Sequence, residues 1–147
     1  MSLNSDALSL PAAITEEDCA RLSGPGLKAF RHITTNWGLG TNDQVKLLGQ
    51  PSRSTYYRWL RKQRSGERLV IPYDVLMRIS AVLNIHRSLI ELFPVKDEAL
   101  TWLIGSHFAP VFGGRAPLAV LLEDEGNGID SVARYLNAWR FGEGNNF

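Results

Sequence analysis

Apolar residues recur along most of this chain three or four positions apart, which is the spacing of one face of an α-helix. Leu27, Phe30, Ile33 and Trp37 are a clear example. No segment has the sustained two-residue alternation of a half-buried strand, so the pattern predicts an all-α protein. We expect a short helix from about residue 15 and further helices over residues 27–37, 41–48, 53–63, 72–84, 89–93, 98–104, 118–122 and 129–141.

Glycine and proline residues divide these predicted helices. Gly24-Pro25-Gly26 predicts a break after the first helix, and Gly38-Leu39-Gly40 ends the second. Gly49-Gln50-Pro51 turns the chain between the third and fourth helices, and Pro94 stops the chain again further on. From these breaks we expect three parts: an N-terminal tail with a short helix over 1–24, one domain over 25–93 and a second domain over 94–147.

Composition limits the kind of protein that this chain can be. Its 147 residues are 44% hydrophobic, which excludes a disordered chain, and a single cysteine excludes an intramolecular disulfide framework. No apolar run approaches the roughly 20 residues that span a bilayer, and the N-terminus lacks the pattern of a signal peptide. We therefore expect a cytoplasmic protein with no membrane association.

The net charge of +1 conceals two regions of opposite charge. Between residues 44 and 66 there are six basic residues and no acidic one. Residues 123–147 contain five acidic residues and only two basic ones, Arg134 and Arg140. Such asymmetry within one chain favours two surfaces with different partners, although a solvated helix face also produces a run of charge.

The basic region has the layout of a helix-turn-helix motif. Thr41 and Asn42 are N-cap candidates for a first short helix, Gly49 forms the turn, and Ser52 can cap the second helix. An apolar stripe would join the two helices through Val45, Leu48, Tyr56, Trp59 and Leu60. The alternative is a generic pair of basic helices in a bundle, but the combination of lengths, cap, turn and charge favours DNA binding.

In this motif the second helix enters the major groove with its N-terminal residues against base edges. We expect base or near-base contacts from Arg53, Ser54, Tyr57 and Arg58, and phosphate contacts further along the helix. Two motifs on adjacent half-sites also imply a homodimer. The predicted DNA-binding residues are Thr41, Asn42, Ser52, Arg53, Ser54, Tyr57, Arg58, Arg61 and Lys62.

Beyond the motif, the chain resembles the Xre/MbcA/ParS antitoxins over about residues 27–142. The element GRxPL (Gly114, Arg115, Pro117 and Leu118) and the later YLNAWR (135–140) carry the resemblance. It implies an antitoxin with an Xre-like helix-turn-helix region and a small toxin-binding domain, encoded beside a RES-domain toxin that consumes NAD⁺. Such an antitoxin binds the toxin, covers its active site and represses the shared operon through operator DNA.

Aromatic residues are the candidate toxin contacts in the second domain. Residues 101–147 hold seven of them, and aromatic and arginine side chains dominate the energetics of many interfaces. Core packing is the alternative, and we favour it for Trp102, Tyr135 and Leu136, as we favour a turn-holding role for Arg115. The predicted toxin-binding residues are Arg115, Tyr135, Trp139, Arg140 and Phe141.

No constellation of a nucleophile and a base, and no spacing of metal ligands, is recognisable in the chain, so we expect no enzyme, no metal and no cofactor. Two alternatives stay open beside the antitoxin. One is a stand-alone helix-turn-helix transcriptional regulator whose C-terminal domain senses a ligand. The other is an interaction module whose basic helix binds an acidic protein.

Overall fold

The computed structural model describes residues 14–123 and 127–142, and every regular element within these ranges is an α-helix. The all-α prediction is confirmed. The predicted N-terminal tail over 1–13 and the acidic turn over 124–126 lie outside the described residues. The helices are α2 (Glu16–Asn36), α3 (Thr41–Leu47), α4 (Arg53–Ser65), α5 (Tyr73–Leu92), α6 (Lys96–Ile104), α7 (Pro117–Leu121) and α8 (Gly128–Arg140).

The predicted break at Gly24-Pro25-Gly26 is wrong, because α2 continues through Pro25 as one helix. It begins at Thr15 with a capping box, in which the Thr15 side chain accepts from the Asp18 backbone and the Asp18 side chain accepts from the Thr15 backbone. An interior proline costs about 3 kcal/mol. Burial of α2 on both sides of Pro25, with Ser23 before it and Leu27 after it, offsets this cost.

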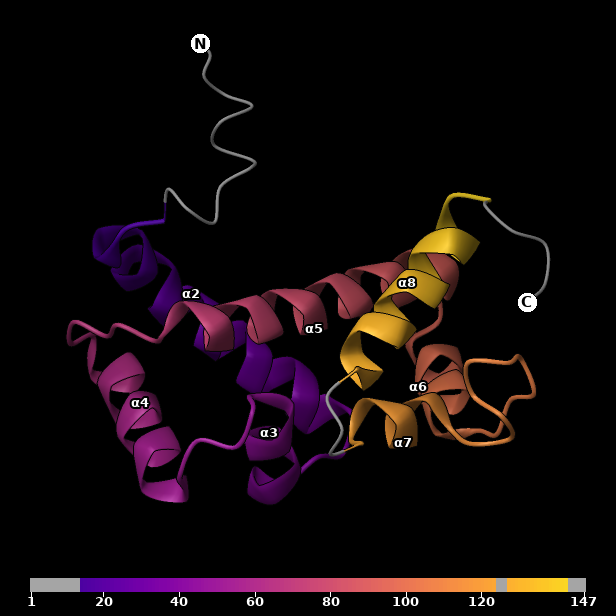
Figure 1. Ribbon diagram of the computed structural model, residues 1–147, viewed down its shortest axis with the longest axis horizontal. Helices are drawn as coiled ribbons and strands as arrows, with labels where there is room; N and C mark the ends of the chain where they lie inside the picture. Colours follow the sequence, from indigo (N-terminus) through magenta and orange to yellow (C-terminus); the bar gives the residue numbers. More distant parts are fainter. Residues whose placement is uncertain (1–13, 124–126, 143–147) are drawn as a thin grey trace, which may run out of the picture.

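The predicted division near Asn84 is also wrong, because α5 is a single helix of 20 residues. No glycine or proline interrupts it, and Val75, Ile79, Val82, Ile85 and Leu89 form one continuous buried stripe. Pro72 is the N-cap of this helix and does not lie in its first turn. In Figure 1, α5 runs along the molecule and packs against α2 and α8.

One buried cluster joins the N-terminal and C-terminal helices. It includes Phe30 of α2, Tyr56 of α4, Ile85 of α5 and Leu136 of α8, all with no exposed side-chain surface. The division into domains 25–93 and 94–147 stays a prediction, and α5 contributes to the packing on both sides of it.

The C-terminal helices pack closely at one glycine. A Cβ added to Gly128, the first residue of α8, would lie 1.8 Å from the carbonyl oxygen of Val120 in α7. Only glycine therefore allows α8 to start against the backbone of α7. Among the described helices, we find none with the length and apolar character needed to cross a membrane.

Candidate nucleic-acid interface and partner surface

The turn between α3 and α4 has the backbone geometry that its sequence indicates. Gly49 and Gln50 both have positive φ, at 88° and 68°, and the Gln50 N–H donates to the Val45 carbonyl over 2.9 Å. A Cβ at Gly49 would also meet the Arg78 side chain of α5 at 2.9 Å. Gly49 thus permits both the left-handed turn and the approach of α5.

The caps of the two helices differ from one another. Ser52 caps α4 as predicted, because its side chain accepts from the Thr55 N–H over 3.0 Å. The prediction for the first helix is wrong, since Gly40 is the N-cap of α3. Thr41 and Asn42 are the first two residues of that helix, so their side chains lie beside the start of α4.

The predicted apolar stripe between α3 and α4 is confirmed. Val45, Leu48, Tyr56, Trp59 and Leu60 are all buried. A buried polar chain adds to this packing: the Tyr56 hydroxyl donates to Gln44 Oε1 over 2.6 Å, and Gln44 Nε2 donates to the Leu39 carbonyl over 2.9 Å. Burial raises the pKa of the Tyr56 hydroxyl, so it stays a neutral donor.

The opposite side of α4 is the basic face, defined here by Arg53, Ser54, Tyr57, Arg58 and Arg61, all of which are exposed. Lys62 lies beside it and is partly buried. None of these residues belongs to the core of the described chain. The helical periodicity of the sequence therefore correctly predicted which side of α4 is packed and which side is exposed to solvent.

Hydrogen bonds tie the start of α4 to the start of α3. The Arg53 guanidinium donates to Asn42 Oδ1 and, over 3.3 Å, to the Tyr57 hydroxyl. The Tyr57 hydroxyl donates to Thr41 Oγ1 over 3.4 Å. These bonds, first the one with Thr41 and then the one with Arg53, lower the pKa of Tyr57. Four of the predicted DNA-binding residues thus form one group at the open end of the motif.

The second surface is built around Trp102 of α6. Its ring stacks on His107 with centroids 5.1 Å apart and meets Phe112 edge-on at 5.6 Å. Tyr135 and Trp139 of α8 lie at 6.2 Å and 6.0 Å from the same ring. We call these five residues the aromatic cluster. Phe112 is fully buried and the other four are partly buried, which raises the pKa of Tyr135.

Two arginines predicted to bind a toxin make contacts within the chain. Arg115 donates to the Phe112 carbonyl over 3.2 Å and forms an ion pair with Glu123. Arg140 donates to Glu91 over 2.9 Å and to Ser88 over 3.0 Å, and its side chain is only 11% exposed. Both arginines therefore stabilise the local structure through contacts within the chain.

The other predicted toxin contacts differ in exposure. Tyr135 and Trp139 are half-buried members of the aromatic cluster, whereas Phe141 is 63% exposed at the end of α8. The Arg140 guanidinium lies 4.7 Å from the centre of the Phe141 ring. Phe141 is therefore the member of the predicted set with the most free apolar surface.

Sequence reasoning missed Phe108, whose side chain is 87% exposed. It lies in the loop between α6 and α7, where helical periodicity assigns no inner or outer side. Backbone bonds from His107 N–H to the Arg115 carbonyl and from Gly114 N–H to the His107 carbonyl close this loop. An aromatic residue in a Gly/Pro-rich loop was the available signal, but it does not distinguish core from surface.

Two stretches of the chain match family models that cover these two surfaces. Residues 20–70 match the antitoxin Xre-like helix-turn-helix domain, and residues 88–142 match the antitoxin Xre/MbcA/ParS C-terminal toxin-binding domain. The chain belongs to the family of Xre-type antitoxins. The basic face lies in the first matched stretch of this antitoxin, and Phe108 and the aromatic cluster lie in the second.

The antitoxin is also similar to y4oB, an uncharacterized protein of Sinorhizobium fredii. The two are 35% identical over 125 residues, which cover 85% of this chain and 91% of the relative. Within the described residues, no group of three or more His, Cys, Asp or Glu side chains is placed to hold a metal ion.

Proposed function

We propose that this antitoxin binds operator DNA through the basic face of α4 and thereby represses its own operon. The observation that supports this best is the exposed row Arg53, Arg58 and Arg61 on the second helix of the motif. Arginine pairs bidentately with guanine in the major groove, which is worth about 1–3 kcal/mol of discrimination per contact. Arg61 and Lys62 lie further along α4, where phosphate contacts supply affinity.

The hydrogen bonds at the open end of the motif support the same role. Asn42 and Tyr57 both bond the Arg53 guanidinium, which limits the rotamers of a long side chain before DNA arrives. A side chain that is already placed loses less entropy on binding. Two copies of the chain would present two α4 helices to half-sites roughly one turn of DNA apart, so the DNA-binding species in this proposal is a homodimer.

We also infer that the partner is a RES-domain toxin that consumes NAD⁺ in the cytoplasm. The GRxPL element and the YLNAWR segment, within the stretch that matches a toxin-binding domain, support this. Neutralisation requires only that the C-terminal part cover the entrance to the toxin's active site. No catalytic group of the antitoxin takes part in this.

Substitution of two arginines tests the DNA-binding half of the proposal. Arg53→Ala combined with Arg58→Ala should abolish a mobility shift of the upstream operon DNA, while the toxin still co-purifies. Arg87→Ala is the matched control, because Arg87 is exposed on α5 outside the motif. Wild-type affinity should also fall steeply with salt. A doubly substituted protein that shifts DNA like the wild type would exclude α4 as the reading helix.

One cavity favours a second candidate function, a transcriptional regulator that senses a small ligand. A cavity of about 340 Å³ lies between α2, α5 and α6, and Trp37, Leu89 and Leu103 are among its mostly apolar lining residues. His86 also lines it, and burial, followed by the charge of His32, lowers the pKa of His86. Small-molecule sites have this size and character.

Purification of the antitoxin at its natural expression level separates the two functions. A toxin that co-purifies in fixed stoichiometry favours the first. A protein that purifies without a partner, and whose melting temperature rises with added small molecules, favours the second.

A further inference from the structure

Phe108 presents an aromatic ring to solvent at a fixed place on the C-terminal part. It is the most exposed of the large apolar side chains in the described residues. The ring lies against Gly114, where an added Cβ would come 3.6 Å from Phe108 Cε1. Because the loop is closed by the two backbone bonds between residue 107 and residues 114–115, the ring is presented by ordered backbone.

A hollow of about 550 Å³ adjoins this ring. Its floor is the exposed side of the aromatic cluster, and its wall is the loop that carries Phe108. The His107 ring is held in this wall by a 2.8 Å hydrogen bond between its Nε2 and the Trp102 carbonyl. No Asp, Glu, Lys or Arg is among the described residues that line it, which are Trp102, His107, Phe108, Ala109, Pro110, Tyr135 and Trp139.

A second hollow shares Trp102 and His107 with the first and has an acidic rim. Asp97, Glu98 and Thr101 of α6 line it. The whole surface therefore combines an apolar centre with a polar, negatively charged edge. This is the usual arrangement of a protein–protein interface, in which aromatic residues at the centre carry most of the binding energy.

We propose that Phe108 and the adjoining hollow are the anchor of the toxin contact. The ring enters an apolar pocket of the toxin, an apolar side chain of the toxin fills the hollow, and a basic residue of the toxin faces Asp97 and Glu98. This inference rests on the proposed function. It shares Tyr135 and Trp139 with the sequence-based prediction but centres the contact on Phe108 instead of on Arg115, Arg140 and Phe141.

Two observations assign this surface to the toxin. It lies wholly inside the stretch that matches a toxin-binding domain. It is also remote from the basic face: Figure 1 shows α6 and the loop after it at one end of the long axis and α4 at the other. A toxin bound there leaves α4 accessible.

The affinity of the full-length antitoxin for the toxin encoded beside it tests the proposal. Phe108→Ala should weaken binding at least about 30-fold, which is the loss expected for an interface hot spot. Met77→Ala is the matched control, because Met77 is an exposed apolar residue on α5 outside the surface, and it should change the affinity less than about threefold. Circular dichroism should give the same melting temperature for all three proteins, since both sites are exposed.

A second variant keeps the test independent of the Phe108 side chain. Ala109→Arg places a long charged side chain at the hollow, and it should weaken toxin binding as strongly as Phe108→Ala. If the wild type binds the toxin and both variants bind it equally well, the anchor lies elsewhere and the proposed function stands. If the wild type does not bind this toxin, this inference and the proposed toxin partner both fail, and the DNA-binding proposal stands on its own test. If Phe108→Ala converts a dimer to a monomer without loss of toxin affinity, the surface joins two antitoxin copies and the inference is overturned.

Discussion

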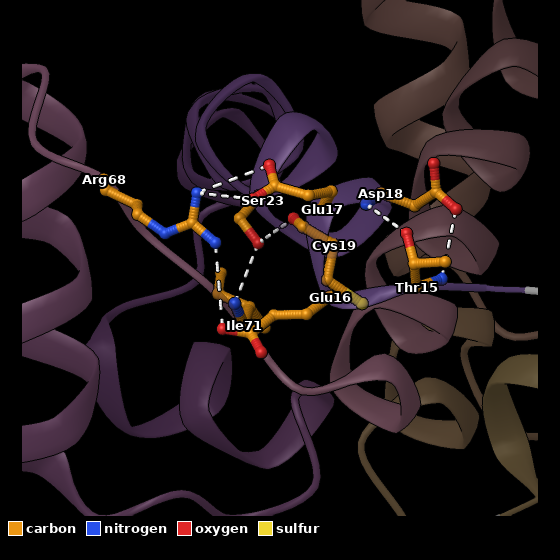
Figure 2. A network of polar contacts seen from close by, with 8 residues as sticks. All are labelled: Thr15, Glu16, Glu17, Asp18, Cys19, Ser23, Arg68 and Ile71. Carbon is orange, nitrogen blue, oxygen red and sulfur yellow. Dashed lines mark hydrogen bonds and ion pairs between the residues drawn. The ribbon is translucent and has the colours of Figure 1, made fainter.

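Ser23 explains at the residue scale how α2 is held beside the start of α5. Its side chain is fully buried, donates to the Cys19 carbonyl over 2.6 Å and accepts from the Ile71 N–H over 2.8 Å (Figure 2). The Ile71 N–H belongs to the non-helical segment between α4 and α5, where no helical partner exists for it. A single hydroxyl thus satisfies a buried backbone donor 48 residues away.

Substitution of this serine should destabilise the fold. Ser23→Ala leaves the Ile71 N–H buried without an acceptor, which costs about 1–3 kcal/mol. Urea denaturation followed by circular dichroism would measure the change in the free energy of unfolding. Ser80→Ala is the control, because Ser80 is exposed on α5 and alanine suits a helix well, so the change there should be small or stabilising. Equal effects at both positions would show that the Ser23 bond contributes nothing specific.

In the candidate nucleic-acid interface formed by α3 and α4, some features depend on neighbouring residues in the sequence and others depend on packing between the helices. The Ser52 cap, the turn at Gly49 and the buried stripe through Tyr56 and Trp59 depend on neighbours within a few residues, so the sequence alone predicts them. The side chain that Arg53 bonds across the motif was not predicted, because Asn42 lies 11 residues away on another helix. Predicting that bond requires the crossing of α3 and α4.

At the scale of elements, the errors fall on the long helices. Pro25 predicts a break, yet contacts with α5 and the Ser23–Ile71 bond keep α2 continuous. The sequence also predicts that a helix ends at Asn84 and another begins near Leu89, yet the buried stripe of α5 continues through this region to Leu89. In α2, tertiary burial overrides a local preference of about 3 kcal/mol, whereas in α5 it has to override only about 0.7 kcal/mol or less at Asn84. The result is a central helix that carries parts of both functional halves.

Helix α8 is docked on α5 by a polar contact as well as by its core residues. Arg140 reaches Ser88 and Glu91 on the last turns of α5, while Val132 and Leu136 are fully buried. Arg87 pairs with the same Glu91 from within α5, but the Arg87 side chain is largely exposed, whereas that of Arg140 is almost wholly buried. The two arginines therefore offer a matched comparison of a buried and an exposed arginine paired with one carboxylate.

We expect Arg140→Ala to lower the free energy of unfolding by about 1–2 kcal/mol, after allowance for the half-exposed carboxylate of Glu91. Arg87→Ala should cost about 0.5 kcal/mol or less, because exposed i,i+4 pairs contribute little. Thermal and urea denaturation of both variants would measure this. If Arg140→Ala weakened toxin binding while stability stayed at the wild-type value, Arg140 would be a contact residue and not a brace for α8.

At the scale of the whole molecule, the net charge of +1 conceals two surfaces of opposite charge, the basic face and the acidic rim formed by Asp97 and Glu98. The basic face lies on α4, and the acidic rim of the aromatic surface lies on α6, at the other end of the long axis (Figure 1). A near-neutral total therefore gives no argument against nucleic acid. The distance between the two surfaces also keeps the anionic DNA away from the acidic rim, where the two would repel each other.

This separation predicts that the toxin and operator DNA bind the antitoxin at the same time. Addition of the toxin to the antitoxin–DNA complex should produce a slower-migrating band in a mobility-shift assay, with the affinity for DNA unchanged or increased. The Phe108→Ala protein should still shift the DNA but should not give the slower band, and the Arg53→Ala, Arg58→Ala protein should give neither. Release of free DNA as the toxin is added would mean that the toxin covers α4 or changes the spacing between the two α4 helices of the dimer. In either case the toxin surface and the DNA surface would not be independent, and the prediction would be wrong.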